Sequence, residues 1–228
     1  LAGAGTQTAG IGFGGNTGSV SALTELYNGS SWTETGDLST ARGQLAAAGT
    51  TTAGLAFGGS DATPAVTNST EEFGGSSWTS GGNLNSARRY LAGFGIQTAA
   101  LATGGAEPTI VAKTEQYNGT SWTEVADLNQ ARRELSGSGT TTAGLAFAGG
   151  PPAYALTEQW DGSSWTEVND LGSARYRGAA SVPAPSTATL YFGGTNSGNQ
   201  SATEEWAFSG IPPTAPAAGY SDAIVGQM

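Results

Sequence analysis

The chain contains no cysteine and no histidine among its 228 residues. Thiol nucleophiles, imidazole acid–base catalysis and zinc sites of the usual kind are therefore excluded. Disulfide bonds are excluded too, so cysteine usage does not indicate a redox compartment. We expect no cofactor and no metal site, with calcium in the loops rich in aspartate and asparagine as the alternative, although no loop has the spacing of an EF-hand.

Charge is scarce, and little of it is positive. Only 11% of the residues are charged, the net charge is −10, and Lys113 is the single lysine. A nucleic-acid binder needs a basic surface to displace counterions from phosphates, and an anionic membrane surface makes the same demand. We therefore expect no nucleic-acid partner. Runs of about 18 apolar residues are absent as well, so we expect no membrane insertion.

Glycine, serine, threonine and alanine take the place of the missing charges. The chain has 37 glycines and a hydrophobic fraction of 37%, which is enough apolar material for a folded core. This composition favours strands and turns over helices. No signal peptide is recognisable, and Leu1 is an unusual first residue, so we expect a processed or excised piece of a longer protein.

Two markers recur along the chain at the same steps of 46, 44 and 43 residues. The first marker is a tryptophan, at Trp32, Trp78, Trp122 and Trp165. The second is the arginine of an Ala-Arg pair, at Arg42, Arg88, Arg132 and Arg175. A third marker, a glycine-rich strand end, occurs at 12–15, 56–59, 102–105, 146–150 and 191–194. The sequence therefore contains five repeat units.

Each unit predicts four short strands. A strand of leucine and small residues follows the Ala-Arg pair, and a second strand ends at the glycines. A variable loop leads to a third strand that reads Thr-Glu-x-aromatic, and a tight turn leads to a fourth strand with the tryptophan. Four strands in about 45 residues are typical of a β-propeller blade. We predict an all-β fold, a five-bladed β-propeller of four-stranded antiparallel blades.

The propeller is expected over residues 1–210, with blades at about 1–38, 39–84, 85–128, 129–171 and 172–210. Small residues on the first strands suit a narrow channel, so we favour five blades that close on themselves over a larger ring of six or seven. The fifth blade departs from the repeat where Ile211-Pro212-Pro213 replaces the tryptophan strand. Residues 211–228 are predicted to form a proline-rich linker or docking tail.

The turn before each tryptophan predicts a tight hairpin. Asn28-Gly29, Asn118-Gly119 and Asp161-Gly162 favour a type I′ turn, in which both central residues have positive φ. The motif is not the Asp-box of sialidases, because Tyr27 stands where that motif has aspartate. We interpret the tryptophans as scaffold, with stacking on a sugar ring as the alternative.

A glutamate recurs on every third strand, at Glu25, Glu71, Glu115, Glu158 and Glu204. These glutamates and the repeated arginines are expected at the same end of each blade, where they can pair. Recurrence in every unit favours structural ion pairs. The alternative is a charged rim around the central channel.

Function is expected in the loops that do not repeat, because loops on a rigid frame carry binding. These loops are 16–22, 60–69, 106–113, 151–155 and 195–202. The candidate ligand-binding residues are Asp61, Asn68, Glu107, Lys113, Tyr154, Asn196 and Asn199. A glycosidase pair would have to come from residues such as Asp61 and Glu107, and nothing in the sequence fixes their separation. We therefore predict no catalytic residues.

The glycine pair after strand two, the aromatic on strand three and the tryptophan on strand four resemble the kelch repeat, with a shorter turn before the tryptophan. The segments TAGLAFGG (52–59) and NGSSWTE (28–34) are similar to kelch-like repeats in tail and appendage proteins of tailed phages, marine ones especially. That resemblance implies a virion or extracellular protein, a tail fibre or appendage that recognises a host-surface glycan or envelope protein without catalysis. Its tail would contact other virion or fibre subunits.

Two alternatives stay open. One is a secreted or cellular kelch-type module for protein interactions, and the other is a carbohydrate-active enzyme. The copper-radical enzymes among kelch proteins need histidine, tyrosine and cysteine, and two of these three residue types are absent from this chain.

Overall fold

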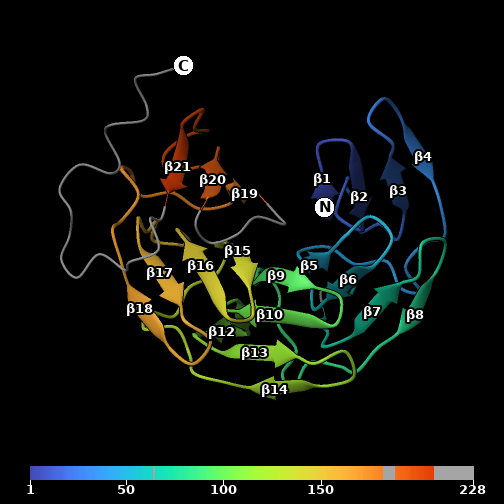
Figure 1. The fold of residues 1–228 in the computed structure, drawn as a ribbon, viewed down its shortest axis with the longest axis horizontal. Coiled ribbons are helices and arrows are strands. Elements are labelled where there is room, and N and C mark those ends of the chain that lie inside the picture. The colour runs from blue at the N-terminus through green and yellow to red at the C-terminus, as the bar shows by residue number, and fades with distance from the viewer. Residues whose placement is uncertain (64, 182–187, 208–228) are drawn as a thin grey trace.

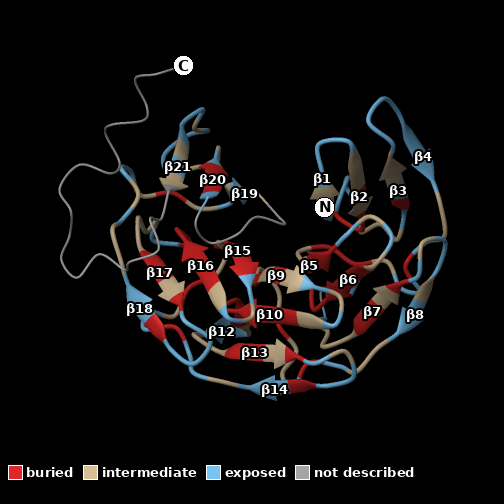
Figure 2. Ribbon diagram, in the orientation of Figure 1, coloured by how far each residue is buried: buried red, intermediate tan, exposed pale blue. Residues whose placement is uncertain are grey.

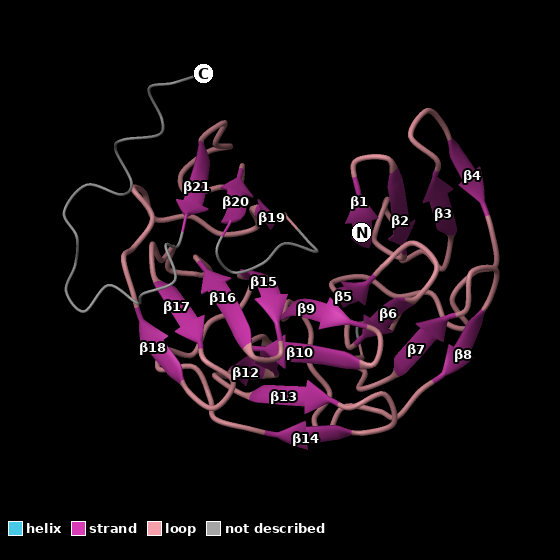
Figure 3. Ribbon diagram, viewed as in Figure 1, coloured by secondary structure: helices cyan, strands magenta, loops and turns pink. Residues whose placement is uncertain are grey.

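The computed structural model of the chain describes residues 1–63, 65–181 and 188–207. They form an all-β, five-bladed propeller of antiparallel blades arranged around a central axis (Figure 1). Figure 3 shows strands and loops and no helix in this part of the chain. The described residues therefore include no helical membrane span. The predicted fold class is confirmed.

Each blade runs outward from the axis in chain order. The first blade comprises β1 (Ala2–Thr6), β2 (Ala9–Phe13), β3 (Thr24–Tyr27) and β4 (Trp32–Glu34). The second comprises β5 (Ala46–Gly49), β6 (Gly54–Phe57), β7 (Thr70–Phe73) and β8 (Trp78–Ser80). The third comprises β9 (Ala92–Ile96), β10 (Ala99–Thr103), β13 (Thr114–Tyr117) and β14 (Trp122–Glu124), and its loop adds a small hairpin of β11 (Ala106–Glu107) and β12 (Thr109–Ile110).

The fourth blade comprises β15 (Ser136–Thr140), β16 (Ala143–Phe147), β17 (Thr157–Trp160) and β18 (Trp165–Glu167). The described part of the fifth blade has three strands, β19 (Ala179–Ala180), β20 (Ala188–Phe192) and β21 (Thr203–Ala207). The segment with Ile211-Pro212-Pro213 and the tail at 211–228 lie outside the described residues.

Among the described residues, the ring is open between the fifth and the first blade. The inner strands β1, β5, β9, β15 and β19 pack against one another in sequence, but no comparable contact joins β19 to β1. Figure 1 shows the blade of β1 to β4 standing apart from the blade of β19 to β21. The blade count is therefore as predicted, whereas the expected closure of five blades on themselves is not seen.

Small residues on the inner strands let neighbouring blades approach closely. A Cβ atom on Gly93 of β9 would lie 2.4 Å from the ring of Phe57 and 2.7 Å from the carbonyl oxygen of Ala47. No side chain fits at that separation, so the glycine is required by packing and not by backbone conformation. The predicted link between small first-strand residues and a crowded axis therefore has a direct structural cause.

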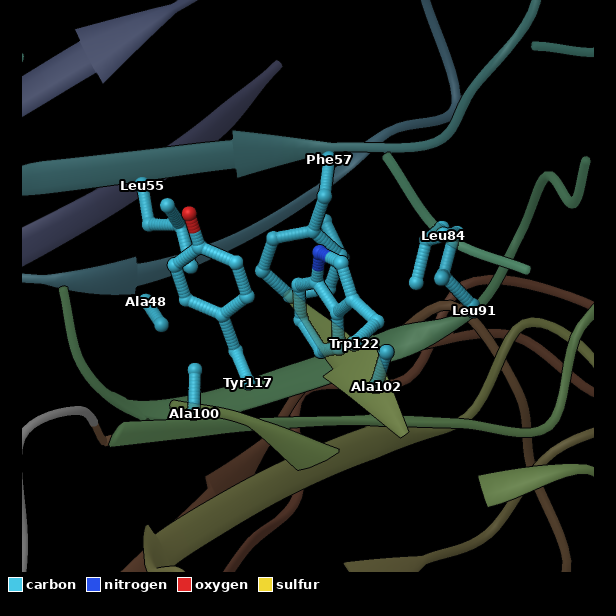
Figure 4. Close-up of a cluster of buried hydrophobic side chains, with 10 residues drawn as sticks. Ala48, Leu55, Phe57, Leu84, Leu91, Ala100, Ala102, Tyr117 and Trp122 are labelled. Atoms are coloured by element: carbon cyan, nitrogen blue, oxygen red, sulfur yellow. The ribbon is translucent and has the colours of Figure 1, made fainter. Parts of the chain in front are cut away.

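The core lies between the blades, and Figure 2 shows the buried positions on the strands of adjacent sheets. Aromatic side chains from neighbouring blades pack together there. Figure 4 shows the junction of the second and third blades, where Leu55 and Phe57 of β6 face Tyr117 and Trp122. The ring centroids of Phe57 and Trp122 are 4.8 Å apart. Burying one such side chain contributes about 1.5–3 kcal/mol, so these junctions supply much of the apolar stabilisation.

The strand-four tryptophan also makes a polar contact with the preceding blade. Its indole N–H donates to the hydroxyl of the threonine that starts β3, β7 or β13. The three bonds are Trp78 to Thr24 (2.9 Å), Trp122 to Thr70 (3.0 Å) and Trp165 to Thr114 (3.2 Å). Each bond fixes the angle between two neighbouring blades and satisfies a donor that the junction buries.

Buried ion pairs hold the connections between blades. The pairs are Arg42–Glu71 (3.0 Å), Arg88–Glu115 (2.8 Å), Arg132–Glu158 (2.8 Å) and Arg175–Glu204 (2.7 Å). The four arginine side chains are at most 1% exposed. They are therefore components of the frame, and the alternative of a charged rim around the channel is wrong for these residues. Glu25 is exposed and has no such partner in the described part of the chain.

The Arg88 pair shows how each site is held together, although the buried Nε atom of Arg88 has no hydrogen-bond partner. The Nη1 atom of Arg88 donates to the carbonyl oxygens of Gly104 (2.9 Å) and Lys113 (2.7 Å). The second carboxylate oxygen of Glu115 accepts from the backbone N–H of Asn85 at 2.7 Å. Burial lowers the pKa of the Arg88 guanidinium, and the neighbouring Glu115 opposes that effect. Glu115 thus holds both the Arg88 side chain and the turn at Asn85 that precedes Arg88 in the chain.

The hairpin between β3 and β4 differs from the predicted type I′ turn. The N–H of Asn28 donates to the carbonyl of Ser31 (3.2 Å), so Gly29 and Ser30 are the central residues. Gly29 has a φ of 94°, whereas Asn28 keeps a negative φ. The Asn28 carboxamide oxygen accepts from the N–H groups of Ser30 and Ser31, both at 3.0 Å. Asparagine is used here as an acceptor that stabilises the turn.

Candidate functional site

The variable loops and the chain turns before each inner strand lie on one face of the propeller. Antiparallel bridges join them blade by blade: Gly43 to Ser60, Arg89 to Ala106, Arg133 to Gly150 and Tyr176 to Thr195. In each bridge the first residue precedes an inner strand and the second begins a variable loop. We call this side, with the loops 16–22, 60–69, 106–113, 151–155 and 195–202, the loop face.

Four residues at the centre of the loop face adopt an unusual backbone conformation. They are Gln44 (φ 58°), Tyr90 (59°), Glu134 (57°) and Arg177 (58°), at the same position of four successive repeats. A side chain in this left-handed region costs of order 1 kcal/mol or more. Such a conformation at a repeated position indicates a strong structural constraint, and strained residues of this kind gather at functional sites.

The constraint is a relay of backbone hydrogen bonds around the axis. The N–H of Tyr90 donates to the carbonyl of Gln44 (2.9 Å), Glu134 donates to Tyr90 (2.8 Å), and Arg177 donates to Glu134 (2.9 Å). Because the backbone alone makes these bonds, the side chains are free to differ. They are an amide, a phenol, a carboxylate and a guanidinium at one structural position.

The side chains of these four residues surround a shallow hollow of about 210 Å³. Leu45, Leu91 and Leu135, which follow three of them in the chain, also line it. We call this hollow the central mouth. Its apolar and polar lining matches what small-ligand sites combine, and its volume is below the usual range for drug-sized ligands, which begins at about 300 Å³. It suits a single small group.

Polar contacts orient the side chains at the central mouth. Ser60 donates to the Gln44 side-chain oxygen at 2.9 Å. Arg177 binds the Glu134 carboxylate through two nitrogens, at 2.9 and 3.1 Å. Hydrogen bonding to Glu134 raises the pKa of Arg177. The Arg177 side chain is 60% exposed and the Glu134 side chain 2% exposed, so the arginine presents its surface to solvent above a buried carboxylate.

Positive charge is concentrated around this mouth. Besides the four arginines of the buried pairs, the chain has three others, Arg89, Arg133 and Arg177. The guanidinium carbons of Arg89 and Arg133 both lie 5.5 Å from the centroid of the Tyr90 ring. Two cations on one aromatic ring hold it in place. The loop face therefore has a cationic, aromatic centre on a chain of net charge −10.

Four of the seven predicted loop residues organise their own loops. Asp61 accepts from the N–H and hydroxyl of Thr63, at 2.8 and 2.7 Å, and these bonds lower its pKa. The Asn68 amide donates to the carbonyl of Leu84 at 2.9 Å. Lys113 pairs with Glu107 at 2.8 Å and also donates to the Ser86 hydroxyl at 2.9 Å. These contacts shape the loops, and ligand binding by these four residues stays a prediction.

The other three predicted residues have freer side chains. Asn196 and Asn199 are exposed and Tyr154 is half-buried, and none of the three makes a side-chain hydrogen bond within the described part of the chain. Asp61 and Glu107, the residues considered for a glycosidase pair, are each engaged in their own loop. No group of three carboxylates suited to a metal ion occurs among the described residues.

The tryptophans differ in access. Trp122 and Trp165 are 5% and 6% exposed, so the blades cover the rings that a sugar would need. Trp32 is 54% exposed, but it lies on the outer strand of the first blade, away from the central mouth. Stacking on a sugar is therefore ruled out for the two buried tryptophans.

The residues of the central mouth were missed from the sequence. Their signal is a position that changes in every repeat, two residues after the constant Ala-Arg pair. The four residues are Gln44, Tyr90, Glu134 and Arg177. Attention to repeated residues hides such a position. Comparison of the chain with protein-family models and with curated proteins finds no match.

Proposed function

We propose that this chain is a non-catalytic recognition module that binds a glycan or envelope protein of a host surface through its loop face. The observation that supports the proposal is the contrast within each repeat. Buried ion pairs recur in four blades and tryptophan–threonine bonds at three junctions, whereas the mouth residues and the loops differ from blade to blade. A constant frame that presents variable side chains is the arrangement expected of a binding surface.

The chemistry of the central mouth favours a sugar ring as the bound group. Tyr90 offers apolar surface to the carbon face of a pyranose, and Gln44 and Arg177 offer hydrogen-bonding groups to its hydroxyls. Additional contacts from Tyr154, Asn196 and Asn199 would make recognition multivalent. The resemblance of the repeat to kelch-like repeats of phage appendage proteins favours a virion tail fibre or another extracellular setting for this proposal, with further virion subunits as proposed partners.

A glycan array probed with the purified chain tests the proposal. We expect binding to at least one glycan, with Tyr90→Ala and Arg177→Gln each reducing the signal about tenfold or more. Gln7→Ala is the matched control, because Gln7 is exposed in the turn between β1 and β2, at the opposite end of its blade. Binding to neither glycans nor isolated bacterial envelope would refute the proposal, and so would binding that both mouth variants leave unchanged.

A further inference from the structure

The first blade exposes a tryptophan whose three counterparts are buried or half-buried. Trp32 is 54% exposed, and its ring contacts the Tyr27 ring of its own hairpin, with centroids 5.2 Å apart. In the other junctions the equivalent ring reaches the preceding blade and donates to a threonine hydroxyl. The indole of Trp32 makes no such bond within the described chain. This surface of the first blade, centred on Trp32, is called the first-blade face.

The fifth blade exposes the opposite half of the same junction. Leu190 and Phe192 on β20 are each 42% exposed, whereas the equivalent Leu55 and Phe57 on β6 are fully buried against the third blade. Thr203 at the start of β21 is exposed too. Its four counterparts on the third strands are at most 1% exposed: Thr24, Thr70, Thr114 and Thr157. We call this surface, with Leu190, Phe192 and Thr203, the fifth-blade face.

The two faces are complementary, because the internal junctions already show how they fit. At the first of these junctions, Trp78 packs on Phe13 with ring centroids 4.8 Å apart and donates to Thr24 at 2.9 Å. By the same geometry Trp32 fits against Phe192 and donates to Thr203. The first-blade face supplies the tryptophan, and the fifth-blade face supplies the aromatic ring and the threonine hydroxyl that such a tryptophan contacts.

We propose that the first-blade face of one copy of this chain docks on the fifth-blade face of a second copy. Intramolecular pairing of the two faces is disfavoured, because the gap in Figure 1 separates them and the intervening junctions are fixed by buried rings and tryptophan–threonine bonds. Closing the gap would require those close-packed junctions to shift together. A second copy reaches each face without that rearrangement.

The contact is heterologous, so it leaves a free face at each end and permits further copies to add. Electrostatic repulsion opposes this association, because each copy carries a net charge of −10. Salt screens this repulsion while the apolar contact persists. Association should therefore strengthen as ionic strength rises. The contact lies outside the central mouth, so this proposal stands or falls independently of glycan binding.

Sedimentation velocity over a range of concentrations tests the proposal with the full chain. We expect dimers and longer species, and a shift of about tenfold or more in the midpoint concentration for Trp32→Ala or Phe192→Ala. Ile96→Ala is the control, because Ile96 is 51% exposed on a different blade and should leave association unchanged. Circular dichroism and thermal unfolding verify that each variant is folded.

Mixing the two variants gives the sharper result. The Trp32→Ala chain keeps an intact fifth-blade face, and the Phe192→Ala chain keeps an intact first-blade face. Each alone should be monomeric, whereas the mixture should form dimers that add no third copy. A native chain that is monomeric at every concentration and salt would overturn the proposal. Oligomers that persist in both variants, or variants whose mixture stays monomeric, would overturn it as well.

Discussion

Replacing Arg88 by methionine tests whether the buried ion pairs hold the frame. The substitution keeps an apolar side chain of similar length but removes the cation that faces Glu115 at 2.8 Å. It also removes the donor to the carbonyl oxygens of Gly104 and Lys113. Glu115 is then a buried carboxylate that retains only its bonds to Asn85.

The expected loss follows from this burial. The two side chains of the pair are 0% and 1% exposed, and removing one partner of such a pair costs about 3–5 kcal/mol. For a chain of this size that loss lowers the melting temperature by about 10 °C. In the double variant Arg88→Met with Glu115→Gln the amide carries no charge, and its oxygen can still accept from the Asn85 N–H. We therefore expect the double variant to be more stable than Arg88→Met by about 1–2 kcal/mol.

Equilibrium unfolding in urea, followed by circular dichroism, measures these free energies. Lys113→Met is the control, because the Lys113–Glu107 pair is 33% and 24% exposed, and a pair on the surface is worth about 0–1 kcal/mol. An Arg88→Met variant that loses less than the control would refute the assignment of the pair to the frame. A double variant less stable than Arg88→Met would show that the bare carboxylate is not the source of the loss.

Three further results are expected. Truncating Trp122 to alanine should cost about 3–5 kcal/mol in urea unfolding, whereas Trp32→Ala in monomeric conditions should cost far less, and equal losses would contradict the burial argument. Hydrogen bonds from Ser163 and Ser164 lower the pKa of Asp161 to about 2, so its stabilisation is complete above its unfolded pKa near 3.8 and is lost as pH falls towards 2. The Asp161→Asn variant, which copies Asn28 and Asn118, should lack that acid-dependent part of the unfolding free energy. Burial and the bond to Glu72 raise the pKa of Tyr117 to about 12, so ultraviolet titration should show one late tyrosine that Tyr117→Phe removes and Glu72→Gln shifts to lower pH.

The blades could be predicted from the sequence because their markers carry the packing. Trp78 and Trp122 recur once per blade because each of them fills one junction between blades. Arg88 and Glu115 recur with the same period because they form one ion pair in each of four blades. Strand order and antiparallel register then follow from short connections. These residues repeat because every blade packs against its neighbours in the same way. A residue that repeats at a constant spacing can be recognised in a single sequence without an alignment.

Other features could not be read in this way. Asn28 was assigned a positive φ from residue preference, but its side chain captures two backbone N–H groups, and only Gly29 takes the left-handed conformation. The opening of the ring depends on contacts between residues that are far apart in the chain, and no local pattern encodes it. Residues such as Asp61 suggested ligand chemistry by type alone, whereas their hydrogen bonds to neighbouring loop atoms are set by the folded backbone.

The backbone relay around the axis has a consequence for how this protein can change. Main-chain hydrogen bonds hold the conformation at Gln44, Tyr90, Glu134 and Arg177. The backbone atoms therefore stabilise the fold at these positions, and the side chains are left for recognition. A substitution at any of these four sites alters the mouth while the hydrogen bonds between blades persist. Gln44 and Tyr90 can be exchanged singly, whereas Glu134 and Arg177 form an ion pair and must change together, so natural variation or a designed library can explore this surface without rebuilding the propeller.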